Sequence, residues 1–500
     1  MMRIPIDRES DVPLYQQIES FLRQAILTGS LAPETRLPAT RQLARDLGIN
    51  RITVENAYAA LEADGLVAPR PGSGTYVLPP VDLPVISRDE AGAPWPLWQQ
   101  ELQAGNGTAQ YPRPGELLRG AGHPAPVDLA GGSGDARLFP VEEYRRVIQA
   151  VLRRDGKAAL DYGEQAGYAP LRATITHILA SQGIPTQPGN VLITAGSQQA
   201  IALVTQLLLK PGDTLLVEDP TYAVALDLFR ALHLKLVGIP MDEYGMQVEK
   251  LEKLLQQHHP RLIYTIPNFH NPTGTCLSTH RRRQLIALAD RYNVPILEDD
   301  YVGDLRYDGR AQPALKSLDP GGRVIYASTF SKMLMPGLRV GFLAADGPVY
   351  ASLVRYKHLT DLTSSNLHQR ALEAYVTVGR YQAHLRRTCQ LYRQRRDAML
   401  QAANRHLPAA AGFETPLGGL FLWLRLPGQM SSTDLLPLAC EEGLSFSPGP
   451  RFFLDGQSGE NYLRLNFASQ PVEQIGEGIK RLGQAIRRLG QLTFSAPPGP

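Results

Sequence analysis

Apolar residues recur at helical spacing near the start of the chain and predict a first helix. Between residues 13 and 27 they lie three or four positions apart, as one buried face of a helix requires. Thr28 and Gly29 follow directly and favour an end of the helix at that point. The pattern therefore predicts an amphipathic helix, and more helices follow it.

Two shorter helices are predicted next. One begins with Thr40 as its N-cap and runs through Leu47, and the other begins with Asn50 as its N-cap and runs through Asp64. Gly48 makes a tight turn between them. Two helices joined by a short glycine turn are typical of a helix-turn-helix.

The pattern changes twice after these helices. Two short extended runs, at residues 66–70 and 75–78, flank Pro-Gly-Ser-Gly and predict a hairpin wing. The wing completes a first domain over residues 10–79. Residues 80–126 are rich in proline, glycine and alanine and show little periodicity, so we expect a semi-extended linker there.

From Val127 onward, buried apolar runs alternate with amphipathic helices, which indicates an α/β sheet with crossover connections. This domain is expected to cover residues 127–490, followed by a disordered tail over 491–500. Each expected strand ends in polar residues, at the edge where open α/β sheets bind ligands. The expected strands are residues 191–197, 214–218, 262–266, 296–299 and 324–328.

Composition adds little to this picture. With 43% apolar and 20% charged residues among 500, the chain is typical of soluble globular protein with two to four domains. The three cysteines at 276, 389 and 440 are too few and too scattered for a disulfide framework or a metal site. The start of the chain has no signal pattern, and no apolar run approaches a membrane span. We therefore expect a cytoplasmic protein without a membrane partner.

Arginine is distributed unevenly, although the net charge of only +3 says little about partners. Arg36, Arg41, Arg45 and Arg51 surround a single acid, Asp46. A locally positive face of this kind suits docking into a DNA groove. The plainer alternative is a small helical domain with a solvated arginine face.

The same segment carries family motifs: Leu-Pro at 37–38, Gly-Ile-Asn-Arg-Ile-Thr-Val at 48–54, Gly-Leu-Val at 65–67 and Gly-Ser-Gly-Thr-Tyr-Val at 72–77. With these motifs, most of residues 12–78 resembles the GntR family of winged-helix regulators. The resemblance implies that the helix after Asn50 enters the major groove of double-stranded DNA and that the wing lies near the minor groove. The candidate DNA contacts are Arg41, Arg51, Thr53, Asn56, Gly72 and Gly74.

Residues 328–342 carry candidate chemistry for an aldehyde with a phosphate group. Lys332 has apolar neighbours, and desolvation lowers the pKa of an amine, so more of it is neutral and can form a Schiff base with a carbonyl. The guanidinium of Arg339 and the hydroxyls of Thr329 and Ser331 can bind a dianionic phosphate. Taken alone, the segment is equally well explained by a solvated lysine before a turn and a strand.

Other strand ends supply the remaining parts of a pyridoxal phosphate (PLP) site. Ser197 and Gln198 begin a helix whose N-terminus can hold a phosphate. Tyr222 can stack on a flat ring and Asn271 offers an amide to a phenolic oxygen, although a core aromatic and a turn former explain them as well. Asp299 provides the carboxylate that must pair with the pyridinium nitrogen.

Together these residues resemble the fold-type-I, class I/II aminotransferase family over roughly residues 127–490. The resemblance implies an α/β fold, with a large α/β/α domain around a mixed sheet and a smaller C-terminal α+β domain. It implies that Lys332 forms the Schiff base and that Asp299 and Tyr222 join it in catalysis. The implied PLP contacts are Lys332, Asp299, Tyr301, Asn271, Tyr222, Ser197, Gln198, Thr329, Ser331, Arg339 and Tyr162.

Two of the implied roles concern the substrate and a second subunit. Arg464 matches the arginine that binds the substrate carboxylate, although an ordinary interface ion pair explains it as well, and Asn271 is the second candidate for substrate binding. Tyr162 matches the tyrosine that reaches a phosphate across the dimer interface.

A GntR-type winged helix joined to an aminotransferase-like domain is the arrangement of MocR-type regulators. That resemblance implies a PLP-binding transcription factor, a homodimer that binds a DNA operator and senses an amino acid, an amine or PLP itself. Release of Lys332 by an incoming amine would change how two winged helices are spaced. Two alternatives stay open: an active aminotransferase, because no catalytic part is visibly lost, and a DNA-binding scaffold with an empty second domain.

Overall fold

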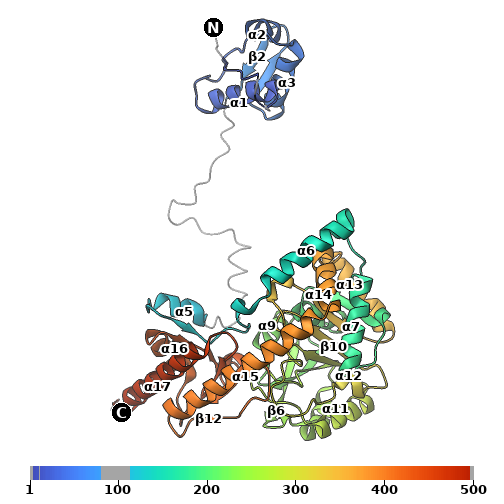
Figure 1. The fold of residues 1–500 in the computed structure, drawn as a ribbon, viewed down its shortest axis with the longest axis vertical. Helices are drawn as coiled ribbons and strands as arrows, with labels where there is room; N and C mark the ends of the chain where they lie inside the picture. Colours follow the sequence, from blue (N-terminus) through green and yellow to red (C-terminus); the bar gives the residue numbers. More distant parts are fainter. Residues whose placement is uncertain (1–3, 9, 11, 80–112, 496–500) are drawn as a thin grey trace. The chain divides into compact units, whose positions relative to one another are not determined.

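The protein consists of two separate units in a computed structural model that describes residues 4–8, 10, 12–79 and 113–495 (Figure 1). The first unit spans Met1–Gly107 and the second spans Thr108–Pro500. Each unit has its own buried apolar core. Across the described ranges, no helix is both long enough and apolar enough to cross a membrane.

Over its described residues, the N-terminal unit contains three helices and a two-stranded antiparallel hairpin, as the sequence predicted. Ile18, Leu22, Val54 and Leu61 are fully buried between the helices. Its elements are α1 (Leu14–Leu27), α2 (Thr40–Leu47), α3 (Arg51–Ala63), β1 (Val67–Arg70) and β2 (Gly74–Val77).

The turn between α2 and α3 shows why the chain folds here as a helix-turn-helix. Gly48 ends α2 with a φ of 62°, a left-handed conformation that glycine adopts without a steric penalty. Asn50 caps α3 by accepting a hydrogen bond from the Ile52 backbone N–H at 3.0 Å. The prediction that Thr40 caps α2 was wrong. The carbonyl of Ala39 accepts the first helical bonds, so Thr40 already lies inside the helix.

The second unit is organised around an eight-stranded mixed sheet. Its strand order is β4-β11-β10-β9-β8-β5-β6-β7, and all neighbours are parallel except at β11 and β7. The five strands expected from the sequence are present, while β6, β7 and β11 were not anticipated. The strands are β4 (Val191–Thr194), β5 (Thr214–Asp219), β6 (Lys235–Asp242), β7 (Gly245–Met246), β8 (Leu262–Thr265), β9 (Ile296–Asp300), β10 (Val324–Thr329) and β11 (Gly341–Ala344).

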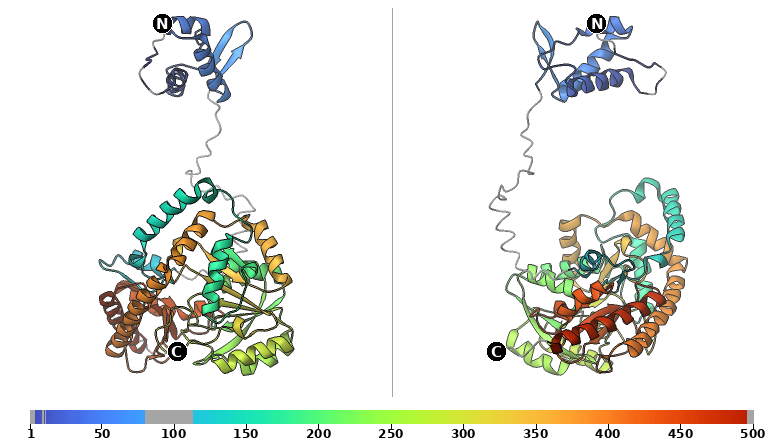
Figure 2. Two further views of the ribbon diagram at one scale, coloured as in Figure 1. Left: turned by 45° about the vertical axis from the view of Figure 1, so that its right-hand side comes forward. Right: turned by 90° about the vertical axis from the view of Figure 1, so that its left-hand side faces the viewer.

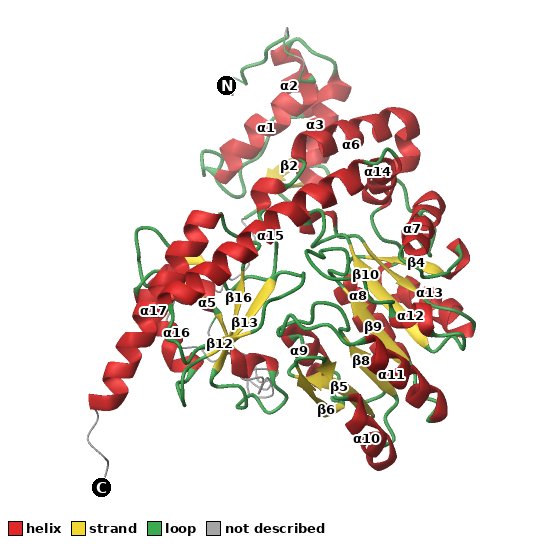
Figure 3. Ribbon diagram, turned by 60° about the horizontal axis from the view of Figure 1, so that its bottom comes forward, coloured by secondary structure: helices red, strands yellow, loops and turns green. Residues whose placement is uncertain are grey.

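Both faces of this sheet are covered by helices, which Figure 3 shows on either side of the strands. Along β5, Leu215 and Val217 join one core and Leu216 joins the other, because successive side chains of a strand point to opposite faces. Helices α8 (Ser197–Leu208) and α9 (Ala223–Ala231) contribute to the first core. Helices α10 (Leu251–His258) and α11 (Thr279–Arg291) contribute to the second. The other helices of this part are α6 (Val141–Asp155), α7 (Ala169–Ser181), α12 (Leu315–Leu318), α13 (Pro348–Asp361) and α14 (Asn366–Thr377).

The C-terminal part of the second unit has a smaller sheet of order β12-β13-β16-β15. The long helices α15 and α17 pack against each other beside it (Figure 2). Its elements are α15 (Arg380–His406), β12 (Gly412–Phe413), β13 (Phe421–Arg425), α16 (Ser432–Glu441), β14 (Leu444–Ser445), β15 (Ser447–Pro448), β16 (Tyr462–Asn466) and α17 (Val472–Ser495).

Two expected segment boundaries differ from the structure. Residues 80–112 of the expected linker lie outside the described residues, but its last part forms the helix α5 (Pro114–Gly120), in which Leu118 is buried. β3 (Val127–Asp128) then pairs in parallel with β14. The helix α17 continues to Ser495, although we expected a disordered tail from residue 491.

We predict that Asn50→Ala lowers the free energy of unfolding of the N-terminal unit by about 1 kcal/mol, because the Ile52 N–H loses its capping acceptor. Urea unfolding of residues 1–79, followed by helical circular dichroism, measures this change. Asn50→Ser keeps a capping oxygen and serves as the control. An unchanged midpoint in Asn50→Ala would show that the cap contributes nothing.

Candidate functional site

A cavity of about 340 Å³ lies at one edge of the large sheet. The strands β4, β5, β8, β9 and β10 run parallel, so their carboxyl ends meet at this edge. Seven of the residues predicted from the sequence line the cavity, although they are spread over more than 260 positions, from 197 to 464. They are Ser197, Tyr222, Asn271, Asp299, Tyr301, Lys332 and Arg464.

Lys332 follows the end of β10 and is placed to act as a nucleophile. Burial, together with the positive charges of Arg464 and Arg339, lowers the pKa of its amine from 10.5 to about 8, and only Asp299 opposes this shift. Roughly a tenth of such an amine is neutral at pH 7, compared with well under a thousandth at the ordinary value. The cavity therefore supplies a reactive amine at neutral pH.

Asp299 is the second-last residue of β9 and is 2% exposed. The hydroxyl of Tyr264 donates a hydrogen bond to its Oδ2 at 2.9 Å. Its Oδ1 is buried and has no hydrogen-bond partner among the described residues. Burial raises the pKa of this carboxyl to about 7, so a cation or a donor facing Oδ1 would stabilise its charged form.

Three further side chains complete the walls near Asp299. Asn271 lies in the loop after β8 and Tyr301 in the loop after β9, and the Tyr301 hydroxyl donates to the Phe269 carbonyl at 3.1 Å. Tyr222 directly precedes α9, and burial raises its pKa to about 12. Both tyrosines are therefore neutral donors at physiological pH.

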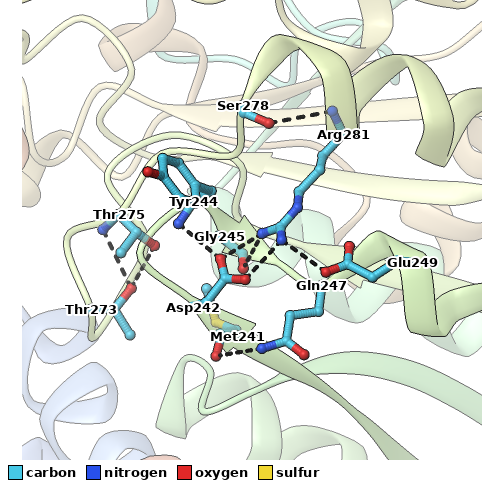
Figure 4. Close-up of polar contacts among 10 residues, drawn as sticks. All are labelled: Met241, Asp242, Tyr244, Gly245, Gln247, Glu249, Thr273, Thr275, Ser278 and Arg281. Carbon is cyan, nitrogen blue, oxygen red and sulfur yellow. Dashed lines mark hydrogen bonds and ion pairs between the residues drawn. The ribbon is translucent and has the colours of Figure 1, made fainter.

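The loop that carries Asn271 is held by a polar network. His270 Nε2 lies 3.2 Å from Glu218 Oε2, and both side chains are buried. The hydroxyls of Thr273 and Thr275 are hydrogen-bonded at 2.8 Å (Figure 4). These contacts hold the loop on both sides of Asn271.

Beside this loop, the β6–β7 hairpin is pinned to the start of α11, as Figure 4 shows. Arg281 binds Asp242 through both oxygens, at 2.5 and 2.7 Å, and reaches Glu249 at 2.9 Å. The paired guanidinium lowers the pKa of the Asp242 carboxyl. The end of β6 and the start of α11 are thus joined next to the loop that carries Asn271.

Arg464 projects from β16 of the smaller sheet into the same cavity. Its Nη1 donates to Asn271 Oδ1 at 2.8 Å and its Nη2 donates to the Ala130 carbonyl at 2.8 Å. Its guanidinium lies 4.0 Å from the centre of the Phe421 ring, and its buried Nε has no partner in the described part of the chain. Burial lowers its pKa to about 10, so it stays charged at neutral pH and can bind an anion.

The remaining predicted phosphate ligands adjoin the cavity without lining it. Thr329 Oγ1 donates to Ser331 Oγ at 3.0 Å, and Arg339 Nη2 donates to the Ala195 carbonyl at 2.5 Å. Gln198 Oε1 is buried and has no partner among the residues described. These groups surround the N-terminus of α8.

The backbone leaves room for an anion at this helix start. Gly196 has a φ of 110°, which favours glycine, and it precedes Ser197 at the first turn of α8. A Cβ on Gly341 would lie 2.7 Å from the carbonyl carbon of Gly196. The backbone at the start of β11 and the backbone before α8 therefore approach so closely that only glycine fits at position 341. Unpaired N–H groups of a helix N-terminus bind phosphate.

Tyr162 is the one predicted PLP contact that the structure does not bring to this site. Its side chain is 77% exposed and does not line the cavity.

The predicted DNA contacts lie on the surface of the N-terminal unit. Arg41, Arg51, Asn56, Gly72 and Gly74 are exposed and Thr53 is half-buried. Arg51 Nε pairs with Glu55 one helical turn away at 2.6 Å.

Sequence reasoning missed three residues of the site. Tyr264 lies in the buried strand β8 and donates a hydrogen bond to Asp299. A tyrosine in a buried strand usually has a hydrogen-bond partner for its hydroxyl, and this rule could have marked it as a candidate. Ser447 and Arg451 line the cavity from the C-terminal part, and no local pattern marks them.

Sequence comparisons agree with this geometry. The family model for aminotransferase class I and II matches residues 132–482. The chain belongs to this family. The model for bacterial regulatory proteins of the gntR family matches residues 14–77, so the N-terminal unit is a DNA-binding domain of that family.

Relatives that share both units are named as regulators. YdfD of Bacillus subtilis, an uncharacterized HTH-type transcriptional regulator, is 32% identical and covers 94% of this chain and 95% of its own. MocR of Rhizobium meliloti, a probable rhizopine catabolism regulatory protein, is 32% identical and covers 95% of this chain and 94% of its own. This member of the aminotransferase family is therefore a DNA-binding regulator of the MocR type.

An aminotransferase structure matches the second unit. LysN, an alpha-aminoadipate aminotransferase from Thermus thermophilus solved with N-(5'-phosphopyridoxyl)-L-leucine, has a TM-score of 0.72 and 35% identity. The match covers 79% of this chain and 99% of LysN. The cofactor of this regulator is PLP. The unpartnered Asp299 Oδ1 and the open helix N-terminus behind Gly196 fit its ring nitrogen and its phosphate.

The lowered pKa of Lys332 predicts how PLP loading depends on pH. Because only the neutral amine attacks a carbonyl, the rate of covalent loading of the apo-protein should rise about tenfold per pH unit below pH 8 and level off above it. The absorbance of the bound cofactor after rapid mixing measures this rate. Lys332→Ala, which binds PLP only non-covalently, is the control. A rate that still rises toward pH 10.5 would mean that the pKa of Lys332 is not lowered.

Proposed function

We propose that this regulator senses an amino acid or a close analogue at its PLP site, and that binding of this effector changes its affinity for DNA. One observation carries the proposal. A reactive amine, Lys332, and a buried guanidinium, Arg464, line one cavity in a chain that also has a DNA-binding domain. The first suits a ligand with a primary amine, and the second suits a ligand with a carboxylate.

PLP supplies an aldehyde and an electron-accepting ring to this cavity. We assign Asp299 to the ring nitrogen, Asn271 and Tyr301 to the phenolic oxygen, and Tyr222 to one face of the ring. The buried position of Asp299 and its bond from Tyr264 support the first assignment. Lys332 is the residue that would hold the cofactor covalently through its amine.

The phosphate is assigned to the groups around the start of α8. Ser197, Gln198, Thr329, Ser331 and Arg339 provide hydroxyl, amide and guanidinium donors there. The position of Arg339 beside Ala195 and the open first turn of α8 support this assignment.

We further propose that the working form is a homodimer, as is usual for the aminotransferase fold. Large apolar side chains exposed on the second unit, among them Val141, Leu160 and Leu359, are 63%, 70% and 80% exposed and suit a covered surface. Tyr162, which is exposed in the same stretch of chain as Leu160, is then available to a partner's phosphate site. A change at the cavity can reach the DNA through the spacing of two winged helices.

The first test concerns the effector. Arg464→Lys should weaken effector binding at least about tenfold, because an ammonium group cannot bind a carboxylate with two parallel hydrogen bonds. A titration with amino acids, followed by the absorbance of bound PLP and by operator affinity, measures this loss. Primary amines without a carboxylate are the matched control, since their binding should not depend on Arg464. Equal losses for both ligand classes would argue against a carboxylate at Arg464.

The second test concerns DNA. Arg51→Ala should weaken operator binding by about 1 to 3 kcal/mol if Arg51 contacts a base, or reduce the salt dependence if it contacts a phosphate. Arg283→Ala removes the same charge from an exposed position on α11 and is the control. Fluorescence anisotropy at several salt concentrations measures both effects. Unchanged affinity and slope would remove Arg51 from the interface.

An aminotransferase activity is the second candidate function, because Lys332, Asp299, Asn271 and Arg464 all face the same cavity. Sustained conversion of an amino acid and a 2-oxo acid would favour the aminotransferase, if its rate exceeds the rate at which DNA binding changes. A single spectral change without turnover supports the sensor.

A further inference from the structure

The cavity wall contains two charged groups that the proposed chemistry does not use, Asp128 and Arg451. Asp299 is assigned to the cofactor, and Arg464 and Lys332 to the carboxylate and the amine of the effector. Arg451 also lines the cavity, and it forms neither a hydrogen bond nor an ion pair with any residue the structure describes.

Arg451 lies in a short 3-10 turn, Gly449–Phe452, that is held firmly in place. The Gly449 N–H donates to Ser432 Oγ at 3.2 Å, and Phe452 is buried at one end of the turn. The Phe452 carbonyl accepts a hydrogen bond from the Thr221 N–H at 2.9 Å, which joins this turn to the loop of Tyr222. The backbone of Arg451 is therefore fixed beside the cavity wall.

Arg451 lies on the same side of the cavity as Arg464, because the ring of its neighbour Phe452 lies 5.0 Å from the Arg464 guanidinium. Burial lowers the pKa of Arg464, and the charge of Arg451 lowers it further. At Tyr222, burial raises the pKa and the charge of Arg451 opposes this increase. The charge that acts on Lys332 from the phosphate side is that of Arg339. Arg451 therefore adds a second positive charge near Arg464, away from the phosphate.

Asp128 is the other charged side chain of the cavity without an assigned role. Its Oδ1 accepts hydrogen bonds from the Ser445 hydroxyl at 2.5 Å and from the Ala130 N–H at 2.9 Å, and no ion pair joins it to Arg451. Arg451 is thus a cation of the cavity that has no anionic partner among the described residues. Arg451 as a residue is half-buried, and a guanidinium without a partner favours an anion.

We infer that the effector carries a second anionic group, so that this site selects an acidic amino acid whose side-chain carboxylate binds Arg451. This inference rests on the proposed function and specifies the class of its effector. A neutral amino acid of the same length leaves Arg451 unpaired, and a basic one places a like charge against it.

Titration of the PLP-loaded, full-length protein with L-glutamate, L-glutamine and L-lysine tests the inference. The absorbance of the bound cofactor gives the dissociation constants. We expect glutamate to bind at least about tenfold more tightly than glutamine, and lysine to bind most weakly. In Arg451→Gln, glutamate should lose this advantage while the affinity for glutamine stays within about twofold.

Two variants exclude a merely structural effect. Arg451→Lys keeps the charge and should retain part of the preference for glutamate. Arg310→Gln removes an exposed charge that does not line the cavity and should change nothing.

The possible results distinguish a failure of this inference from a failure of the proposed function. If no amino acid changes the spectrum of the wild-type protein, the proposed function is overturned. If amino acids bind but glutamate is not preferred, or if its preference survives in Arg451→Gln, only the second anionic group is overturned.

Discussion

The parallel register of the large sheet is the constraint on which the site depends. Because β4, β5, β8, β9 and β10 all run the same way, residues from five distant segments reach one edge without any long loop. The antiparallel β11 begins at that edge and brings Arg339 back beside the start of α8. The C-terminal part then closes the cavity with side chains of the smaller sheet, among them Arg464, and with Arg451 from the turn Gly449–Phe452.

Burial of charge gives this cavity its chemistry. Lys332, Asp299 and Arg464 have pKa values shifted toward neutrality because water is excluded from all three. Asp299 Oδ1 and Arg464 Nε have no partners in the described part of the chain, and such buried atoms cost free energy unless a ligand satisfies them. The site is thus built at the expense of stability, as is common where a protein binds a charged ligand.

The sequence predicted correctly the features that depend on residues close together along the chain. The helix-turn-helix, the five parallel strands and the seven cavity residues could be read from the sequence because strand ends and family motifs are short-range features. The prediction that Thr40 caps α2 was wrong. The N-cap is the residue whose carbonyl accepts the first helical hydrogen bond, and that residue is Ala39. Tyr264, Ser447 and Arg451 were missed because their roles depend on partners that lie far away in the sequence.

Helix α5 has a consequence for signalling between the two units. Pro114 and Gly115, at its start, form part of the cavity wall, and the helix packs on α16. The first described helix after the DNA-binding domain is therefore part of the ligand site itself. A ligand that displaces α5 would act on the N-terminal end of the second unit, which is the end at which the chain joins the winged helix.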